Sequence, residues 1–277
     1  MRKLKIKNKY VLLGDVDSIN IEIIVKSFHF LKNKVQYLII CNKHDLTKKI
    51  NLKINELYDP ISFENYKKNE LNVYNIENIS KKKYLNLINQ IKIANNLANQ
   101  TKFDLITLPV DKSLFKKNIK FTGMTEYLGK LNKKFTILMM YGDKFSVIPY
   151  TTHINIKNVY RYIKLRNINF FLNNLFINLK RKIYFLKFNE IKFLCYNPHC
   201  GENGTLGNED LLLKKILNNY KKVKGPYAAD SSFNDIKKNT LFLSSYHDQV
   251  LIPFKILNNK SLNLTLGLKY RRLSPAH

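Results

Sequence analysis

The stretch Tyr10-Val-Leu-Leu-Gly-Asp-Val-Asp-Ser-Ile-Asn-Ile-Glu-Ile23 contains a strand, a turn and the start of a helix. Tyr10–Leu13 is a short apolar run, and apolar residues recur at helical spacing over Ile19–Leu31. Strands and helices continue along the chain, with strands expected at Gln36–Cys41, Asp104–Leu108, Phe135–Met140, Phe145–Tyr150, Ile191–Cys195 and Thr240–Leu243, and helices at Ser80–Gln100, Val159–Leu179 and Glu209–Tyr220. This rhythm predicts an α/β protein with a largely parallel sheet.

Two local features complete this prediction. Ser80 is a plausible N-cap for the long helix that follows it, and Asn65–Asn78 is so polar and rich in asparagine that we expect a surface excursion there. In parallel sheets, functional residues gather on the loops that follow the carboxyl ends of the strands. The informative motifs of this chain fall on such loops.

Composition limits the class of protein. The 277 residues are 45% hydrophobic, which is enough for one large domain or two closely joined ones. The longest apolar runs, such as Phe135–Tyr141, have only strand length, and the basic start Met1–Lys9 has no apolar signal core behind it. Cys41, Cys195 and Cys200 lack the paired spacing of a metal site. We therefore expect a cytoplasmic protein with reduced cysteines and no membrane contact.

The net charge of +28 raises the question of nucleic acid binding. Only six of the 48 basic residues are arginines, although arginine is the usual bidentate reader of phosphate and guanine. The lysines are spread along the whole chain beside many asparagines and isoleucines. We therefore expect no specific nucleic acid partner, although the charge can help attract an anionic substrate.

Three histidines stand just after predicted strands. His153, His199 and His247 lie in polar, loop-like contexts with small or turn-forming neighbours. Three imidazoles that converge from separate loops can form a divalent metal site with open positions for a substrate. Taken alone, their wide spacing in sequence favours the alternative that each of the three histidines hydrogen-bonds its own loop.

The segment Asn197-Pro-His-Cys-Gly-Glu-Asn-Gly-Thr-Leu-Gly-Asn-Glu209 has an unusual composition. Its three glycines allow a tight loop, and Asn208 can cap the next helix. A glycine loop that runs into a helix N-terminus can bind an anion. A simple strand-to-helix turn explains the same pattern, which matches neither a Walker loop nor a dinucleotide fingerprint.

Taken in order, eight segments resemble the 4-hydroxythreonine-4-phosphate dehydrogenase family of pyridoxal phosphate biosynthesis. They cover nearly the whole chain: Leu13-Gly-Asp-Val-Asp-Ser-Ile-Asn-Ile-Glu-Ile, Leu108-Pro-Val-Asp-Lys, Thr122-Gly-Met-Thr-Glu-Tyr-Leu, Thr151-Thr-His-Ile, Asn197-Pro-His-Cys-Gly-Glu, Gly225-Pro-Tyr-Ala-Ala-Asp, Tyr246-His-Asp-Gln and Asn263-Leu-Thr-Leu-Gly-Leu. The resemblance implies a three-layer α/β/α fold like that of isocitrate and isopropylmalate dehydrogenases. It implies two lobes, residues 1–120 joined by 250–277 and residues 121–249, with the active site in the cleft between them.

The resemblance also implies a reaction. The family uses NAD, with NADP as the alternative, to oxidise 4-phosphohydroxy-L-threonine to a β-keto acid, which then decarboxylates to 3-amino-2-oxopropyl phosphate. It implies a homodimer with the active site at the interface and a divalent metal, with zinc favoured over magnesium, cobalt or manganese. No compact motif places the cofactor pocket.

The resemblance assigns roles to individual residues. His153, His199 and His247 match the metal ligands. Asp230, Asp248 and Lys255 match positions for ligand orientation or proton transfer. The positions that hold the phosphorylated substrate are matched by Thr125, Met124, Lys255, Asn263 and Arg272. Each also has an ordinary alternative: the cations as surface charges, Thr125 as a helix cap, Asn263 in a turn and the aspartates as loop caps.

Some positions depart from the family pattern. Met124 replaces a histidine and cannot donate a hydrogen bond to an anion, and Asp111 replaces an asparagine. Ser18 and Asn20 replace glycines, and serine tolerates positive φ poorly. After Arg272 the sequence given ends within six residues, where the family continues into a glycine-containing loop, so we expect weaker binding of the adenine half of NAD. These departures keep two alternatives open: a dehydrogenase for threonate or erythronate phosphates, and a non-catalytic basic binding protein on the same fold.

Overall fold

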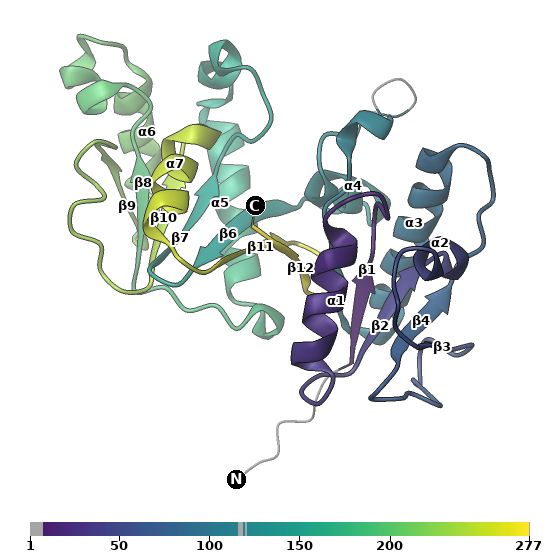
Figure 1. The fold of residues 1–277 in the computed structure, drawn as a ribbon. Coiled ribbons are helices and arrows are strands. Elements are labelled where there is room, and N and C mark those ends of the chain that lie inside the picture. Colours follow the sequence, from purple (N-terminus) through teal and green to yellow (C-terminus); the bar gives the residue numbers. More distant parts are fainter. Residues whose placement is uncertain (1–7, 116–118, 120, 277) are drawn as a thin grey trace. The chain divides into compact units, whose positions relative to one another are not determined.

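The computed structural model describes residues 8–115, 119 and 121–276. The chain forms two compact units (Figure 1). Unit 1 contains the residues up to Lys134 together with Leu268–Pro275, and unit 2 contains Phe135–Gly267. Within the described residues, no helix is both long and apolar enough to cross a membrane.

Unit 1 is built on a parallel sheet. Its strands lie in the order β3-β4-β2-β1-β5-β12, and every adjacent pair is parallel. The strands are β1 (Lys9–Leu12), β2 (Tyr37–Cys41), β3 (Ile54–Glu56), β4 (Leu71–Asn75), β5 (Asp104–Thr107) and β12 (Arg272–Pro275). The helices are α1 (Asn20–Leu31), α2 (Lys43–Thr47), α3 (Lys83–Thr101) and α4 (Met124–Leu131), with the 3-10 turn η1 (Lys112–Phe115).

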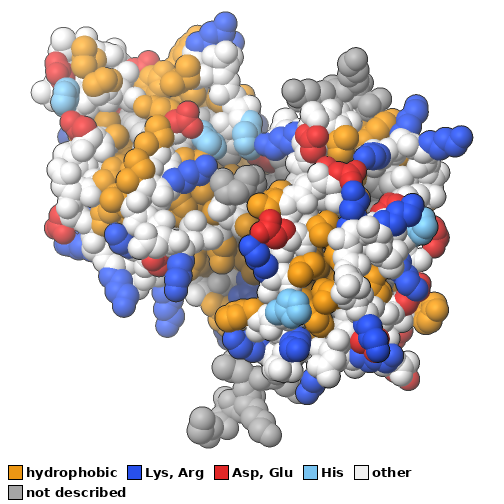
Figure 2. Space-filling model, in the orientation of Figure 1, with side chains coloured by type: hydrophobic (Ala, Val, Ile, Leu, Met, Phe, Trp, Pro, Cys, Tyr) orange, Lys and Arg blue, Asp and Glu red, His pale blue; other side chains and the backbone are white. Residues whose placement is uncertain are grey.

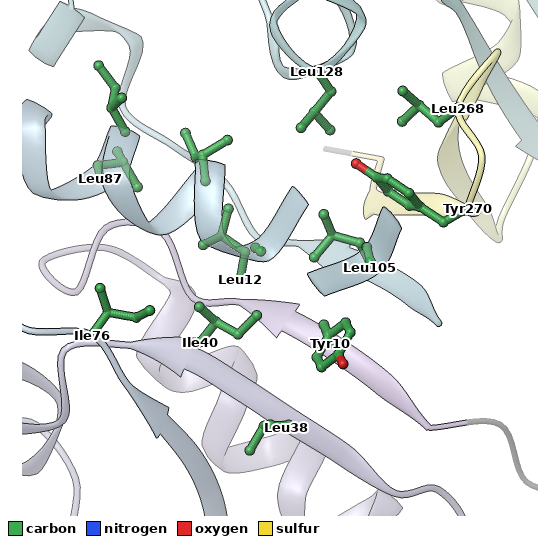
Figure 3. Packing of buried hydrophobic residues seen from close by; sticks show 14 of the residues in the cluster. Tyr10, Leu12, Leu38, Ile40, Ile76, Leu87, Leu105, Leu128, Leu268 and Tyr270 are labelled. Carbon is green, nitrogen blue, oxygen red and sulfur yellow. The ribbon is translucent and has the colours of Figure 1, made fainter. Parts of the chain in front are cut away.

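Helices cover both faces of this sheet because successive strand residues point to opposite sides. Tyr10 and Leu12 of β1 pack with α3 and α4 in one buried cluster, part of which is shown in Figure 3. Val11 and Leu13 pack on the other side with Ile24 of α1. A strand that is buried on both faces reads as a continuous apolar run, which is the pattern of this opening stretch.

Unit 2 carries a mixed sheet in the order β11-β6-β7-β10-β8-β9. The pairs β11–β6 and β6–β7 are antiparallel, and the remaining pairs are parallel. The strands are β6 (Ile137–Gly142), β7 (Phe145–Pro149), β8 (Glu190–Leu194), β9 (Val223–Tyr227), β10 (Thr240–Ser244) and β11 (Ser261–Leu266). The helices are α5 (Leu165–Leu179), α6 (Glu209–Leu217) and α7 (His247–Leu257), with 3-10 turns η2 (Ile156–Tyr162), η3 (Lys182–Tyr184) and η4 (Pro198–Gly204).

The structure corrects several expected elements. β4 occupies the segment expected as a surface excursion, and its Leu71 and Val73 are fully buried. The helix expected over Val159–Leu179 is divided into η2 and α5. Ser80 is not the N-cap of α3, because that helix begins at Lys83 and the Ser80 hydroxyl instead accepts a hydrogen bond from the Lys82 amide.

The boundaries of the units differ from residues 120/121 and 249/250, where the sequence analysis placed them. The first boundary falls at Lys134/Phe135, because Leu128 of α4 is buried in the core of unit 1. The second falls at Gly267/Leu268, because α7 packs on β7 and β10 of unit 2, with Phe254 in their core.

Candidate functional site

The three candidate histidines follow three adjacent strands of unit 2. β10 lies between β7 and β8, and all three run parallel. His153 follows the end of β7, His247 follows β10, and His199 follows β8. Because parallel strands end at the same edge of a sheet, the three histidine loops emerge at one edge of unit 2.

Backbone and hydroxyl contacts join the loops of His153 and His247. The Tyr150 amide donates to the Ser244 carbonyl at 2.8 Å, and the Thr151 hydroxyl donates to the Ser245 carbonyl at 2.6 Å. The imidazole centroids of His153 and His247 consequently lie 5.8 Å apart. The structure thus brings together two of the three predicted ligands.

Asp248 supports this pair through His247. Its Oδ1 lies 2.7 Å from Nδ1 of His247. When Nδ1 carries the proton and donates it to the carboxylate, Nε2 keeps a lone pair that can bind a metal. Carboxylate–histidine pairs of this kind orient metal ligands in many sites.

His199 lies in a backbone turn of unusual handedness. Residues 199–204 all have positive φ, between 44° at Glu202 and 100° at Gly204. Left-handed residues other than glycine cost roughly 1–2 kcal/mol each. Strain of this kind is concentrated at functional sites, where the surrounding structure holds it in place.

Two side chains that the sequence analysis did not identify hold this turn in position. The carboxylate of Asp210, only 2% exposed, accepts the amides of Tyr196 and Asn197 at 2.6 and 2.8 Å. Gln249 of α7 donates to the Cys195 carbonyl at 2.7 Å. The acidic start of α6 and the glutamine beside His247 are the sequence signals for these roles, but only the fold shows their contacts.

His199 itself has a separate carboxylate neighbour. Its Nδ1 lies 3.7 Å from Oδ2 of Asp230, and both side chains are 62% exposed. In the part of the chain that the structure describes, no group of three or more His, Cys, Asp or Glu side chains is arranged to hold a metal. One chain therefore offers the His153–His247 pair and, apart from it, the His199–Asp230 pair.

The thiol of Cys200, beside His199, is not ionised. Cys195 is buried immediately after β8, as expected, and Cys200 is free of any disulfide. Burial and the neighbouring Cys195 thiol raise the pKa of Cys200 to about 12. The Cys200 thiol therefore stays protonated at neutral pH.

Arg272 is held in the interior of unit 1. Its side chain is buried on β12, and its guanidinium donates from Nε to the Thr107 hydroxyl oxygen at 3.0 Å. Burial lowers the pKa of Arg272 to about 10, so the group remains charged at neutral pH. Thr107 ends β5 just before the Leu108-Pro-Val-Asp-Lys motif, so this contact ties Arg272 to that loop.

The other predicted substrate residues divide between the units. In unit 1, Thr125 is buried in the first turn of α4, and Met124 packs against the apolar core. In unit 2, Lys255 is exposed in the last turn of α7, and Asn263 lies half-buried on β11.

The substituted loop positions are accommodated without unusual backbone angles. Neither Ser18 nor Asn20 has positive φ, and Nδ2 of the buried Asn20 donates to the carbonyls of Leu13, Asp15 and Pro109. Both carboxylate oxygens of Asp111 accept hydrogen bonds from Ser113. These residues thus shape their own loops.

Comparison with known proteins shows which family this chain is similar to. The family model described as "Pyridoxal phosphate biosynthetic protein PdxA" matches residues 21–277. A 4-hydroxythreonine-4-phosphate dehydrogenase of Aquifex aeolicus (strain VF5) is 32% identical over 288 residues, covering 96% of this chain and 88% of the relative. The enzyme of the same name from Hydrogenobaculum sp. (strain Y04AAS1) is 38% identical over 176 residues, covering 62% of this chain and 56% of the relative.

A solved structure supports the fold. The crystal structure of 4-hydroxythreonine-4-phosphate dehydrogenase from Klebsiella pneumoniae matches with a TM-score of 0.79 and 21% identity. The match covers 98% of this chain and 91% of that one. The predicted α/β fold is therefore confirmed.

Proposed function

This chain belongs to the family of the pyridoxal phosphate biosynthetic protein PdxA, and we propose that it oxidises 4-phosphohydroxy-L-threonine with NAD. The β-keto acid product then decarboxylates to 3-amino-2-oxopropyl phosphate. The observation that carries this proposal is the His153–His247 pair, backed by Asp248, at the carboxyl edge of the unit 2 sheet. A cytoplasmic location is part of the same proposal.

The donor set fits a divalent metal, with zinc favoured. His153 and His247 supply imidazole nitrogens, and Asp248 can hold a proton on Nδ1 of His247, which leaves Nε2 as a ligand. When bound, the metal supplies Lewis-acid stabilisation of charge on the substrate oxygen. Exposed His199 brings a third imidazole, with Asp230 beside it as its orienting carboxylate.

The remaining residues have roles in binding the substrate. Arg272 carries a permanent charge and a planar fork of donors, which suits a phosphate or carboxylate. Lys255 and Asn263 add a cation and an amide, and Thr125 adds a hydroxyl. Met124 contributes packing within unit 1, so in this proposal it shapes the wall beside Thr125 and makes no polar contact with the substrate.

We further propose that the active site is completed in a homodimer. The helix that begins at His247 exposes Ile252 and Ile256, which are 60% and 73% exposed and lie four residues apart on one face of α7. Figure 2 shows apolar side chains exposed over α7. Leu206 beyond the His199 turn and Ile156 beyond His153 are also exposed. Apolar surface beside all three histidine loops favours a protein partner there, and a second copy would bring its own ligands.

The test is NADH formation by the purified protein with 4-phosphohydroxy-L-threonine, NAD and added zinc or magnesium. We expect turnover that a chelator abolishes and that His199→Ala removes. His29→Ala is the matched control, because His29 is exposed on α1 of unit 1 and has no assigned role. Turnover that survives both the chelator and His199→Ala would refute the metal-centred mechanism.

Substrate choice needs its own comparison. Threonate and erythronate phosphates, tested in the same assay, should be poorer substrates than 4-phosphohydroxy-L-threonine. A higher kcat/KM for either compound would identify that compound as the substrate. The proposed roles of the site residues would stay the same.

A further inference from the structure

Unit 2 contains a cavity whose lining includes none of the residues assigned to the reaction. It has a volume of about 470 Å³, within the usual size range of small-molecule sites. Its walls come from the segment before β6, the loop that follows β7, the end of η2 and the first two turns of α5. All of these segments belong to unit 2, so the cavity is complete within one compact unit.

Aromatic side chains dominate the walls of this cavity. Five of the ten lining residues are aromatic: Phe135, Tyr150, Tyr162, Phe170 and Phe171. The rings of Phe135 and Phe170 pack edge to face with 4.8 Å between their centroids. Even so, Phe135, Tyr162 and Phe170 remain 43%, 43% and 53% exposed. Aromatic rings that gather around a cavity and stay open to solvent indicate a binding site for an apolar group.

Hydrogen bonds hold these walls in place. The Tyr150 hydroxyl donates to the Tyr162 carbonyl at 2.8 Å, and the Tyr150 ring packs edge to face on Phe171. Burial raises the pKa of Tyr150, so the hydroxyl keeps its proton and this hydrogen bond at neutral pH. The hydroxyl of Thr151, also in the lining, donates to the Ser245 carbonyl at 2.6 Å. The cavity is therefore formed before any ligand enters it.

The charge of the cavity is positive. Arg166, in the first turn of α5, is the only charged residue in the lining. It is exposed, and it makes no ion pair with the described residues. The first turn of α5 has no acidic residue, so the partial positive charge of the helix start adds to that of Arg166. A ligand with a negative group is attracted here and meets no carboxylate in the lining.

We propose that this cavity binds a small aromatic anion, a planar ring system that carries a carboxylate or a phosphate. Contacts between aromatic rings contribute more than the buried area alone, so these walls favour an aromatic ligand over a saturated one of the same size. The guanidinium of Arg166 presents a planar fork of donors that matches either anionic group. The inference does not depend on the proposed reaction.

Fluorescence anisotropy of 2-naphthoate, titrated with the full chain, tests the proposal. The chain contains no tryptophan, so no indole emission overlaps the signal. Three competitors then separate the contributions: 2-naphthyl phosphate, neutral 2-naphthol and saturated decahydro-2-naphthoate. We expect at least one aromatic anion to bind about tenfold more tightly than 2-naphthol and about threefold more tightly than the saturated acid.

The ranking of the two aromatic anions identifies the preferred group. Tighter binding of 2-naphthyl phosphate assigns a phosphate to the ligand, and tighter binding of 2-naphthoate assigns a carboxylate. If neither anion binds more tightly than 2-naphthol, the proposal is overturned.

Two variants and a control locate the binding. Arg166→Gln should weaken 2-naphthoate binding about tenfold and leave 2-naphthol unchanged, whereas Arg161→Gln, at an exposed arginine outside the lining, should change neither. Phe170→Leu should weaken both ligands about threefold. All three side chains are exposed, so the thermal midpoints should stay close to that of the parent protein.

Two results would refute the assignment. One is unchanged binding of 2-naphthoate in both Arg166→Gln and Phe170→Leu. The other is a change of oligomeric state in Phe170→Leu with no change in affinity, which would show that a second copy of the chain covers these rings.

Discussion

The two units hold their candidate residues in opposite ways. In unit 1, Arg272 of β12 and Thr125 of α4 are both buried. In unit 2, His153 and His199 are exposed on loops, and Asp248 is exposed in the first turn of α7. A buried polar residue contributes to the packing of the fold as well as to any reaction, whereas an exposed side chain contributes less to packing. Substitutions in unit 2 should therefore cost activity alone, and those in unit 1 should cost stability too.

The largest effect is expected for the His153–His247 pair of unit 2. His247→Ala should lower NADH formation more than a hundredfold, because loss of a carboxylate behind a metal ligand alone costs about 10–100-fold. Its thermal midpoint should match that of the parent protein, since the ring is partly exposed at the start of α7 and its hydrogen-bond partner Asp248 is exposed. If the thermal midpoint of His247→Ala fell by many degrees, the prediction that substitutions in unit 2 cost activity alone would be wrong.

In unit 1 the largest stability effect should come from Asp104. This carboxylate, 7% exposed, binds Lys9 of β1 at 2.7 Å and Arg271 at 2.6 Å, beside β12. Asp104→Asn should lower the free energy of unfolding by about 2–3 kcal/mol, measured by urea denaturation. Lys26→Ala, which breaks the exposed pair with Glu22, is the control and should change little.

Asp104 also makes the free energy of unfolding depend on pH. Burial alone would raise the pKa of Asp104, but hydrogen bonds from Arg271 and Lys9 outweigh it and lower the pKa. A lowered folded-state pKa means that the stabilisation is present above the unfolded value, about 3.9, and is lost as the pH falls through the folded value. The gap in stability between parent and Asp104→Asn should therefore narrow below about pH 4. A constant gap would show that the charge is not involved.

A smaller effect should come from the carboxylate behind His247. Asp248→Asn should weaken metal binding about 10–100-fold, measured by competition with a chromophoric chelator. The side chain is 74% exposed, so the thermal midpoint should not change. Asp235→Asn, at a position of unit 2 with no assigned role, should bind metal normally.

The smallest effect is expected for Thr107, and it tests whether the buried Arg272 binds the substrate as well as stabilising unit 1. Thr107→Val removes the acceptor of the Arg272 guanidinium, and we expect a loss of about 1–2 kcal/mol in stability together with a raised KM for the substrate. Thr107→Ser keeps the hydroxyl and should restore KM. If KM is unchanged in Thr107→Val, Arg272 acts in the fold alone.

The opening strands could be predicted because a strand buried on both faces has a continuous apolar sequence. The loops that carry the histidines could be predicted because they follow directly after such strands. β4 could not, since its buried Asn72 looks like a loop residue. The Asn72 amide is satisfied by the carbonyls of Lys67 and Glu70, which only the folded backbone supplies. The break between η2 and α5 has no glycine or proline to mark it.

For the candidate site, the sequence predicts residue types but not how those residues are arranged in space. Sequence motifs pointed to His153 and His247, but their proximity depends on the pairing of β7 with β10, two strands far apart in the chain. The anchoring roles of Asp210 and Gln249 depend in the same way on contacts between distant segments.

The left-handed turn at residues 199–204 limits the residue types that can occupy these positions without strain. Elsewhere the chain is crowded with lysine, isoleucine and asparagine, yet the segment from Cys195 to Asp210 contains no lysine and no isoleucine. Asparagine adopts positive φ readily, lysine adopts it at Lys102 and Lys133 of this chain, and a β-branched side chain at positive φ is a severe outlier. At residues 199–204 the backbone therefore tolerates glycine and asparagine better than isoleucine.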